Sequence, residues 1–99
     1  MTAFDEGMER IRASFRARAD EHSASVRAAL AQGDREGLRT LAHKLCGTAG
    51  TLGFSEVSES AMRLEDLLDD GASPADVYTA AEGLAALLAS EAATPGGAP

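Results

Sequence analysis

Apolar residues recur at steps of three and four residues in four separate segments of this 99-residue chain, and this spacing constrains the fold more than any other feature. Such steps follow the period of an α-helix and place the apolar side chains on one face. The segments lie at about 4–32, 34–51, 55–70 and 73–93. No segment alternates with the period of a strand. Four amphipathic helices joined by short loops predict an all-α fold, an antiparallel up-down four-helix bundle.

Each expected helix carries its own apolar stripe. The stripes comprise Phe4, Met8, Ile11, Phe15, Ala19, His22, Val26 and Leu30; Leu38, Leu41, Ala42, Leu45, Ala49 and Leu52; Val57, Ala61, Leu64 and Leu68; and Val77, Ala80, Ala81, Leu84 and Leu88. If the first helix is continuous, it spans roughly 42 Å at the α-helical rise and is longer than the second. We therefore expect the first helix either to overhang the bundle as an N-terminal extension or to break near Gly7.

Turn and capping residues separate the four segments. Gly33 is expected to end the first helix, and Asp34 to cap the second. Gly53 permits a turn before Ser55, which we expect to cap the third helix. A serine followed by proline, Ser73-Pro74, is a strong signal for the start of the fourth helix.

Composition argues against several classes of function. The net charge of −7 disfavours binding to nucleic acid, whose phosphates would be repelled. No apolar run approaches the length of a membrane span, and the first residues lack the apolar stretch of a signal peptide. The single cysteine, Cys46, cannot form an internal disulfide and fits a reducing compartment. We expect a monomeric, cytoplasmic protein with one domain over residues 1–93 and a disordered tail over residues 94–99.

Residues 41–54 place one histidine on the side of the second helix that faces away from its apolar stripe. His43 falls about 140° around the helix from the start of that stripe. Three small residues, Cys46, Gly47 and Gly50, lie around it. Two glycines inside a helix cost roughly 1 kcal/mol each relative to alanine. Close approach of another surface to His43 would offset that cost.

This stretch resembles the histidine-containing phosphotransfer (HPt) domain family. The family motif reads roughly Ala-His-x-Leu-Lys-Gly, followed by small residues, a glycine and an apolar residue. The chain has Ala42-His43-Lys44-Leu45-Cys46-Gly47 and then Thr48-Ala49-Gly50-Thr51-Leu52-Gly53-Phe54. Looser similarity covers residues 15–68 and includes Met62-Arg63-Leu64-Glu65. The family usually has a lysine where this chain has Cys46.

The resemblance implies the same bundle fold and a phosphoryl acceptor at His43. An imidazole in water is largely neutral at pH 7 and keeps a free lone pair for attack on an aspartyl phosphate. In that family the aspartate belongs to a receiver domain of a response regulator or a hybrid histidine kinase. The receiver carries the magnesium and most catalytic groups. The chain would then be a phosphorelay carrier that needs no cofactor of its own and is not an enzyme, and it has no ATP-binding motif.

Five further residues are candidates for docking a partner or assisting the phosphate. Arg39, one turn before His43, and Lys44 can each bring a positive charge, and Arg39 is our candidate to replace the family lysine. Gly47 and Gly50 would keep the surface around the imidazole open, and Cys46 takes the lysine position. Each also has an ordinary interpretation, as a solvated charge or a small packing residue.

Other functional interpretations of the sequence have weaker support. His22 lies in an apolar stripe and is expected to be a core or boundary residue. The spacing of His22, His43 and Cys46 matches no zinc pattern, so we expect no metal site. A solvated acidic face is expected from Glu56, Glu59, Glu65, Asp66, Asp69 and Asp70.

The alternative function is a helical interaction or dimerisation bundle without phosphate chemistry. A dimeric kinase-like phosphotransferase normally needs an appended ATP-binding-like domain, for which 99 residues leave no room.

Overall fold

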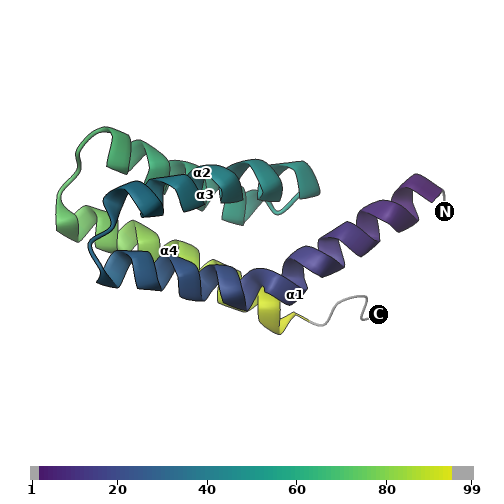
Figure 1. The fold of residues 1–99 in the computed structure, drawn as a ribbon. Coiled ribbons are helices and arrows are strands. Elements are labelled where there is room, and N and C mark those ends of the chain that lie inside the picture. Colours follow the sequence, from purple (N-terminus) through teal and green to yellow (C-terminus); the bar gives the residue numbers. More distant parts are fainter. Residues whose placement is uncertain (1–2, 95–99) are drawn as a thin grey trace.

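The computed structural model describes residues 3–94, and these residues form four helices joined by short loops. The helices are α1 (Ala3–Ala31), α2 (Arg35–Leu52), α3 (Ser55–Asp69) and α4 (Pro74–Ala93). They run alternately in opposite directions, with α1 against α4 and α2 against α3 (Figure 1). No strand occurs in residues 3–94. The predicted antiparallel four-helix bundle is confirmed.

One face of each helix packs into a common core. The largest fully buried side chains are Val26, Leu38, Val57, Leu64, Leu84 and Leu88. Burying each such side chain stabilises the fold by about 1.5–3 kcal/mol relative to leaving it in water. The stripes predicted for α2, α3 and α4 are confirmed, with Leu41, Leu68 and Ala80 half-buried at the edges of the core.

The first helix projects beyond the bundle at its N-terminal end (Figure 1). It has 29 residues, whereas α2 has 18, so its first turns have no helix opposite them. Phe4 and Ile11 are consequently 74% and 55% exposed, although both lie on the predicted apolar stripe. From Phe15 onward the stripe is in the core or at its edge. The expected overhang is confirmed, and the alternative of a break near Gly7 is wrong, because the helix continues through that glycine.

Most of the predicted caps are present. Asp34 accepts a hydrogen bond from the Gly37 N–H at 2.9 Å, and Ser73 accepts one from the Asp76 N–H at 3.3 Å. Gly53 ends α2 with φ 84°, a conformation that glycine adopts without a steric penalty. These contacts satisfy backbone groups that the helix ends would otherwise leave without a partner.

The expectation that Ser55 caps α3 is wrong. The helix already includes Ser55, and the capping position is held by Phe54, with no side-chain hydrogen bond. The Phe54 ring is buried and stacks on Phe15 with 4.9 Å between ring centroids. Burial of this ring, rather than a polar cap, fixes where the chain enters α3.

The described residues end at Thr94, directly after α4. Of the tail predicted at residues 94–99, all but Thr94 therefore lies outside the described residues. No helix in the described part of the chain is long and apolar enough to cross a membrane.

Candidate functional site

His43 stands on the outer side of α2, facing away from the core, as its helical phase predicts. Its side chain is 72% exposed. The imidazole Nδ1 lies 2.8 Å from Oε2 of Glu65 on α3. An ionised carboxylate only accepts hydrogen bonds, so Nδ1 carries the proton and donates it. The lone pair is then left on Nε2, the ring nitrogen that is free of this contact.

Glu65 is held in turn by Arg39 on α2, which also binds Asp69 on α3. The Glu65 side chain is only 16% exposed, and its Oε2 lies 3.6 Å from Nη2 of Arg39. The Arg39 Nε donates a hydrogen bond to Asp69, one turn further along α3. This hydrogen bond raises the pKa of Arg39, with smaller contributions from the charges of Asp69 and Glu65. Asp69, Arg39, Glu65 and His43 thus form one connected network that fixes the orientation of the imidazole.

The expectation of a solvated acidic face is wrong for Glu65. The residue directly follows Leu64 in the core, so its side chain lies at the edge of the α2–α3 contact rather than in open solvent. The available sequence signal was its position in Met62-Arg63-Leu64-Glu65, the segment that is similar to the third helix of the HPt family.

The two candidate cations lie on opposite sides of His43. A helical projection puts Arg39 about 40° to one side of His43 and Lys44 about 100° to the other. Arg39 accordingly faces α3, where its guanidinium is bound by two carboxylates. Lys44 is exposed and lines the space between α2 and α1. Arg39 is thus connected to the imidazole through Glu65, whereas Lys44 belongs to the opposite side of the site.

The three small residues near His43 also divide between two environments. Cys46 is half-buried, with its Sγ 3.7 Å from Oγ of Ser58 on α3, and the Ser58 hydroxyl donates to the Cys46 carbonyl at 2.9 Å. A Cβ added to Gly50 would lie 3.0 Å from the same Ser58 Oγ. A Cβ added to Gly47 would meet nothing within 4 Å. Cys46 and Gly50 therefore face the contact with α3, and Gly47 faces open space beside His43.

The family model described as Hpt domain matches residues 10–93. The chain belongs to the Hpt domain family. Hpt domains are phosphotransfer carriers in two-component signalling and interact with receiver domains. Comparison with curated proteins and with solved structures gave no match. The match spans the bundle from the base of the projecting part of α1 to the end of α4 and confirms the family resemblance.

A shallow opening leads to His43 of this Hpt domain from the α1 side. Its lining comprises Met8, Ile11, His43, Lys44, Gly47, Thr48, Thr51 and Leu52. The site therefore combines an exposed ring nitrogen with a mixed apolar and polar surface. Such an arrangement can present a nucleophile to a phosphoryl group that a partner brings to it.

The second histidine of the Hpt domain, His22, lies on α1 and is half-buried. Its ring centroid is 5.8 Å from that of Phe15. Burial lowers the pKa of His22, and the nearby positive charge of Arg18 lowers it further, while Glu21 acts in the opposite direction. This is the boundary position that the sequence predicts. Within residues 3–94, no group of three or more His, Cys, Asp or Glu residues could hold a metal ion.

Cys46→Lys, which restores the family residue, is expected to fold with a loss of about 1 kcal/mol in the free energy of unfolding. A lysine stem can lie along the α2–α3 contact while its ammonium reaches water, but it must displace the Ser58 side chain. Denaturant unfolding measures the loss, with Cys46→Ala as the matched control. A loss above about 3 kcal/mol, the range of a disrupted core, would show that this side of α2 cannot open.

Proposed function

We propose that this Hpt domain is a phosphorelay intermediate in which His43 accepts a phosphoryl group from the aspartate of one receiver domain and passes it to another. The supporting observation is the geometry of His43: an exposed imidazole whose Nδ1 is held by Glu65 at 2.8 Å, so that the nucleophilic nitrogen is Nε2. The family supports the general role in phosphotransfer.

The proposed step is an attack of the Nε2 lone pair on the phosphorus of an aspartyl phosphate. An N–P bond forms as the bond between phosphorus and the aspartyl oxygen breaks, and the aspartate leaves as a carboxylate with the electron pair. The Nδ1 proton stays on the ring. Positive charge develops on the imidazole, and Glu65 stabilises it through the Nδ1–H hydrogen bond. Transfer to the next receiver is the reverse reaction.

The receiver is proposed to supply what this chain does not contribute. Magnesium binding and most catalytic groups would belong to the receiver, so the chain acts as a carrier and requires no cofactor of its own. A single copy is proposed as the unit that transfers the phosphoryl group. We assign Gly47 to close approach of the receiver and Lys44 to contact with the phosphate or the receiver. Arg39 is proposed to act mainly through Glu65, because its guanidinium is already bound there.

Incubation with a phosphorylated receiver tests the proposal. We expect the phosphoryl label to move to this chain, and the label to be labile in acid and stable in alkali, as phosphohistidine is. The alternative, a helical interaction bundle without phosphate chemistry, predicts that no label moves from any receiver in a panel. An acid-stable label would also contradict the proposal.

Glu65→Ala is expected to slow transfer about tenfold, which corresponds to a loss of about 1.4 kcal/mol of transition-state stabilisation. The variant loses both the acceptor for Nδ1–H and the charge opposite the imidazole. Glu65→Gln keeps an acceptor without the charge, so its transfer rate should lie between those of the wild type and Glu65→Ala. Single-turnover transfer from a phosphorylated receiver measures the effect. Glu59→Ala removes an exposed acid from the same helix and is the matched control; transfer by Glu65→Ala at the control rate would exclude this role.

A further inference from the structure

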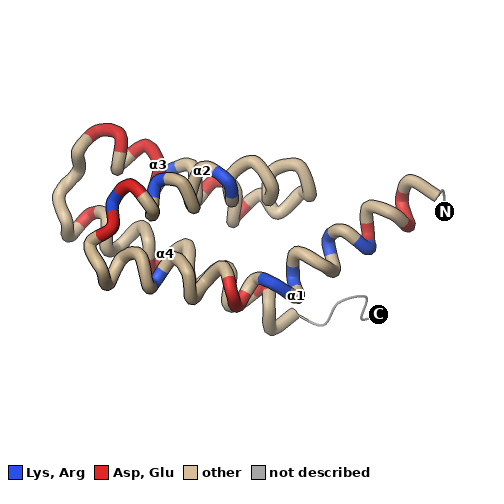
Figure 2. The backbone as a smooth tube through the Cα atoms, in the orientation of Figure 1, with Lys and Arg blue, Asp and Glu red and all other residues tan. Residues whose placement is uncertain are grey.

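The last turn of α3 carries an acidic residue at a place where an acid is locally unfavourable. The helix ends at Asp69, and its last turn contains no basic residue. The C-terminal end of a helix has a partial negative charge, which repels a carboxylate. Figure 2 shows acidic residues toward this end of α3 and basic residues in the first half of α2. The favourable contact of Asp69 is accordingly outside its own helix, with Arg39.

Two pairs of side chains join α2 and α3 one turn apart. His43 lies opposite Glu65, and Arg39, one turn before His43, lies opposite Asp69, one turn after Glu65. The Arg39 Nε donates a hydrogen bond to Asp69, whereas its Nη2 is 3.6 Å from Oε2 of Glu65, an ion pair without a hydrogen bond. The same Oε2 accepts the Nδ1–H of His43 at 2.8 Å. Asp69 thus holds the guanidinium beside the carboxylate that orients the imidazole.

We propose that Asp69 is a positioning residue for His43, because by binding Arg39 it keeps the guanidinium from closing onto Glu65. An unrestrained guanidinium favours two parallel hydrogen bonds to one carboxylate. Glu65 is already in ion-pair contact with Arg39 and is the carboxylate onto which it would close. Pairing of that kind would neutralise the charge of Glu65 and weaken the hydrogen bond that it accepts from Nδ1–H.

This arrangement determines which ring nitrogen of His43 carries the lone pair. The position of the imidazole proton is set by the hydrogen bond that the ring makes. While Arg39 is bound to Asp69, the Glu65 carboxylate holds the proton on Nδ1 and leaves the lone pair on Nε2. A Glu65 neutralised by Arg39 would hold the proton less firmly and would stabilise less of the positive charge that develops on the ring during transfer. The effect on transfer rests on the proposed function, whereas the effect on the proton does not.

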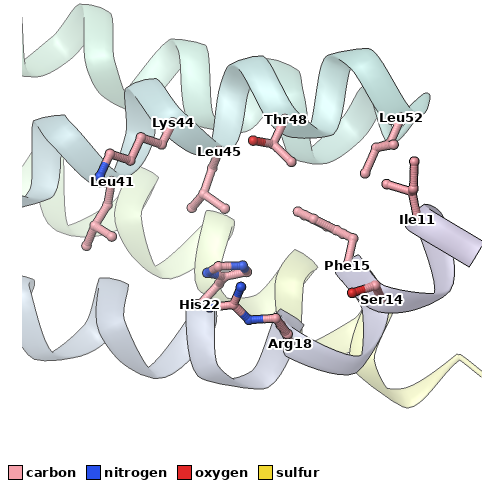
Figure 3. Close-up of a pocket in the computed structure, with 10 residues that line it drawn as sticks. All are labelled: Ile11, Ser14, Phe15, Arg18, His22, Leu41, Lys44, Leu45, Thr48 and Leu52. Atoms are coloured by element: carbon pink, nitrogen blue, oxygen red, sulfur yellow. The ribbon is translucent and has the colours of Figure 1, made fainter.

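The other sides of His43 supply no competing carboxylate. Lys44 lies on the side of α2 that faces α1 (Figure 3). From α1, Met8 and Ile11 line the opening beside His43, and neither side chain can titrate. No acidic residue in the described part of the chain lines this opening or the space between α1 and α2. The acceptor at Nδ1 is therefore Glu65, and the cation next to that acceptor is Arg39.

The test compares the ring tautomer of His43 in Asp69→Ala and in the wild type. Nitrogen-15 shifts of the ring, recorded at about pH 9 where an imidazole in water is neutral, give the ratio of the Nδ1–H form to the Nε2–H form. Asp69→Ala should lower this ratio about threefold, a factor typical of partly exposed charges. Both forms are neutral, so the loss of a remote charge without movement of Arg39 would change the ratio little. Asp70→Ala removes the neighbouring acid at the same helix end and is the matched control, with an unchanged ratio expected.

A second pair of chains tests whether Asp69 acts through Arg39. In Arg39→Gln no guanidinium remains to close onto Glu65, so adding Asp69→Ala should leave the ratio as it is in Arg39→Gln alone. An equal fall in both backgrounds overturns the proposal. An unchanged ratio in Asp69→Ala also overturns it, and together with a lower melting temperature it would make Asp69 a purely structural residue.

Single-turnover transfer from a phosphorylated receiver extends the test to the reaction. Asp69→Ala should transfer more slowly than Asp70→Ala by a factor similar to the change in the tautomer ratio. Transfer at the control rate overturns the role of Asp69 in the reaction. A wild-type chain that accepts no phosphoryl group contradicts the proposed function instead, because the tautomer measurement needs no phosphate and decides the role of Asp69 at the imidazole by itself.

Discussion

Replacing His43 by glutamine is expected to abolish phosphoryl transfer and leave the bundle folded. Glutamine has no nucleophilic nitrogen, so no N–P bond can form. The His43 side chain is 72% exposed, and among residues 3–94 its one polar side-chain contact is with Glu65. Stability should therefore change by no more than about 0.5 kcal/mol. Labelling from a phosphorylated receiver measures the loss, and circular dichroism measures the retained helix.

His22→Gln is the matched control for that experiment. His22 is half-buried between the helices and beside Phe15, so its replacement removes an imidazole without touching the exposed site. The variant should still accept the phosphoryl group. Full labelling of His43→Gln, or loss of labelling in a folded His22→Gln protein, would contradict the assignment of His43 as the acceptor.

Substitutions at Gly47 are expected to change stability and transfer in opposite directions. A side chain here meets nothing within 4 Å, so Gly47→Ala should stabilise the fold by about 0.5–1 kcal/mol through helix propensity and a less flexible unfolded chain. Gly47→Leu should also fold. Its side chain would stand one turn from His43, where it blocks the approach of a receiver. Misplacement of reacting groups by about 1 Å can slow a reaction by about 100-fold, and we expect a loss of that order.

Gly50 provides the comparison for Gly47. A Cβ at Gly50 approaches the Ser58 Oγ to 3.0 Å, and Ser58 cannot turn away without losing its hydrogen bond to the Cys46 carbonyl. Gly50→Ala should therefore stabilise the fold less than Gly47→Ala does. Thermal melts of the Gly47 and Gly50 variants, together with their rates of phosphoryl transfer from a receiver, test these expectations. A lower melting temperature for Gly47→Ala, or normal transfer by Gly47→Leu, would show that this glycine does not keep the histidine accessible.

The fold could be predicted from the sequence because helical period and capping residues are local signals. The stripe through Leu38, Leu45 and Leu52 fixes which side of α2 is buried, and therefore that His43 is exposed. The same period cannot say where neighbouring helices end. Phe4 and Ile11 have the spacing of core residues, but both are exposed. Phe4 lies on the part of α1 that projects beyond the bundle, and Ile11 lies at the base of that part, beside the end of α2 at Leu52.

The surroundings of His43 were less predictable, because they depend on how α2 and α3 are rotated against each other. In projection, Arg39 and Cys46 lie about 40° and 60° to one side of His43, and Gly47 about 40° to the other. Nothing in that projection says which side α3 covers. The structure places α3 on the side of Arg39 and Cys46, where Glu65 reaches across 22 residues of sequence to the imidazole. Because α3 does not cover the other side of His43, Gly47 faces open space.

The central claim is that His43 accepts the phosphoryl group on Nε2 while Nδ1 remains bonded to Glu65. Nuclear magnetic resonance of the phosphorylated chain, labelled with nitrogen-15 in histidine, tests this claim most directly. We expect coupling of phosphorus to Nε2 of one histidine, with a proton retained on its Nδ1, and loss of that signal in His43→Gln. Phosphorus on Nδ1, on His22 or on no histidine at all would contradict the account.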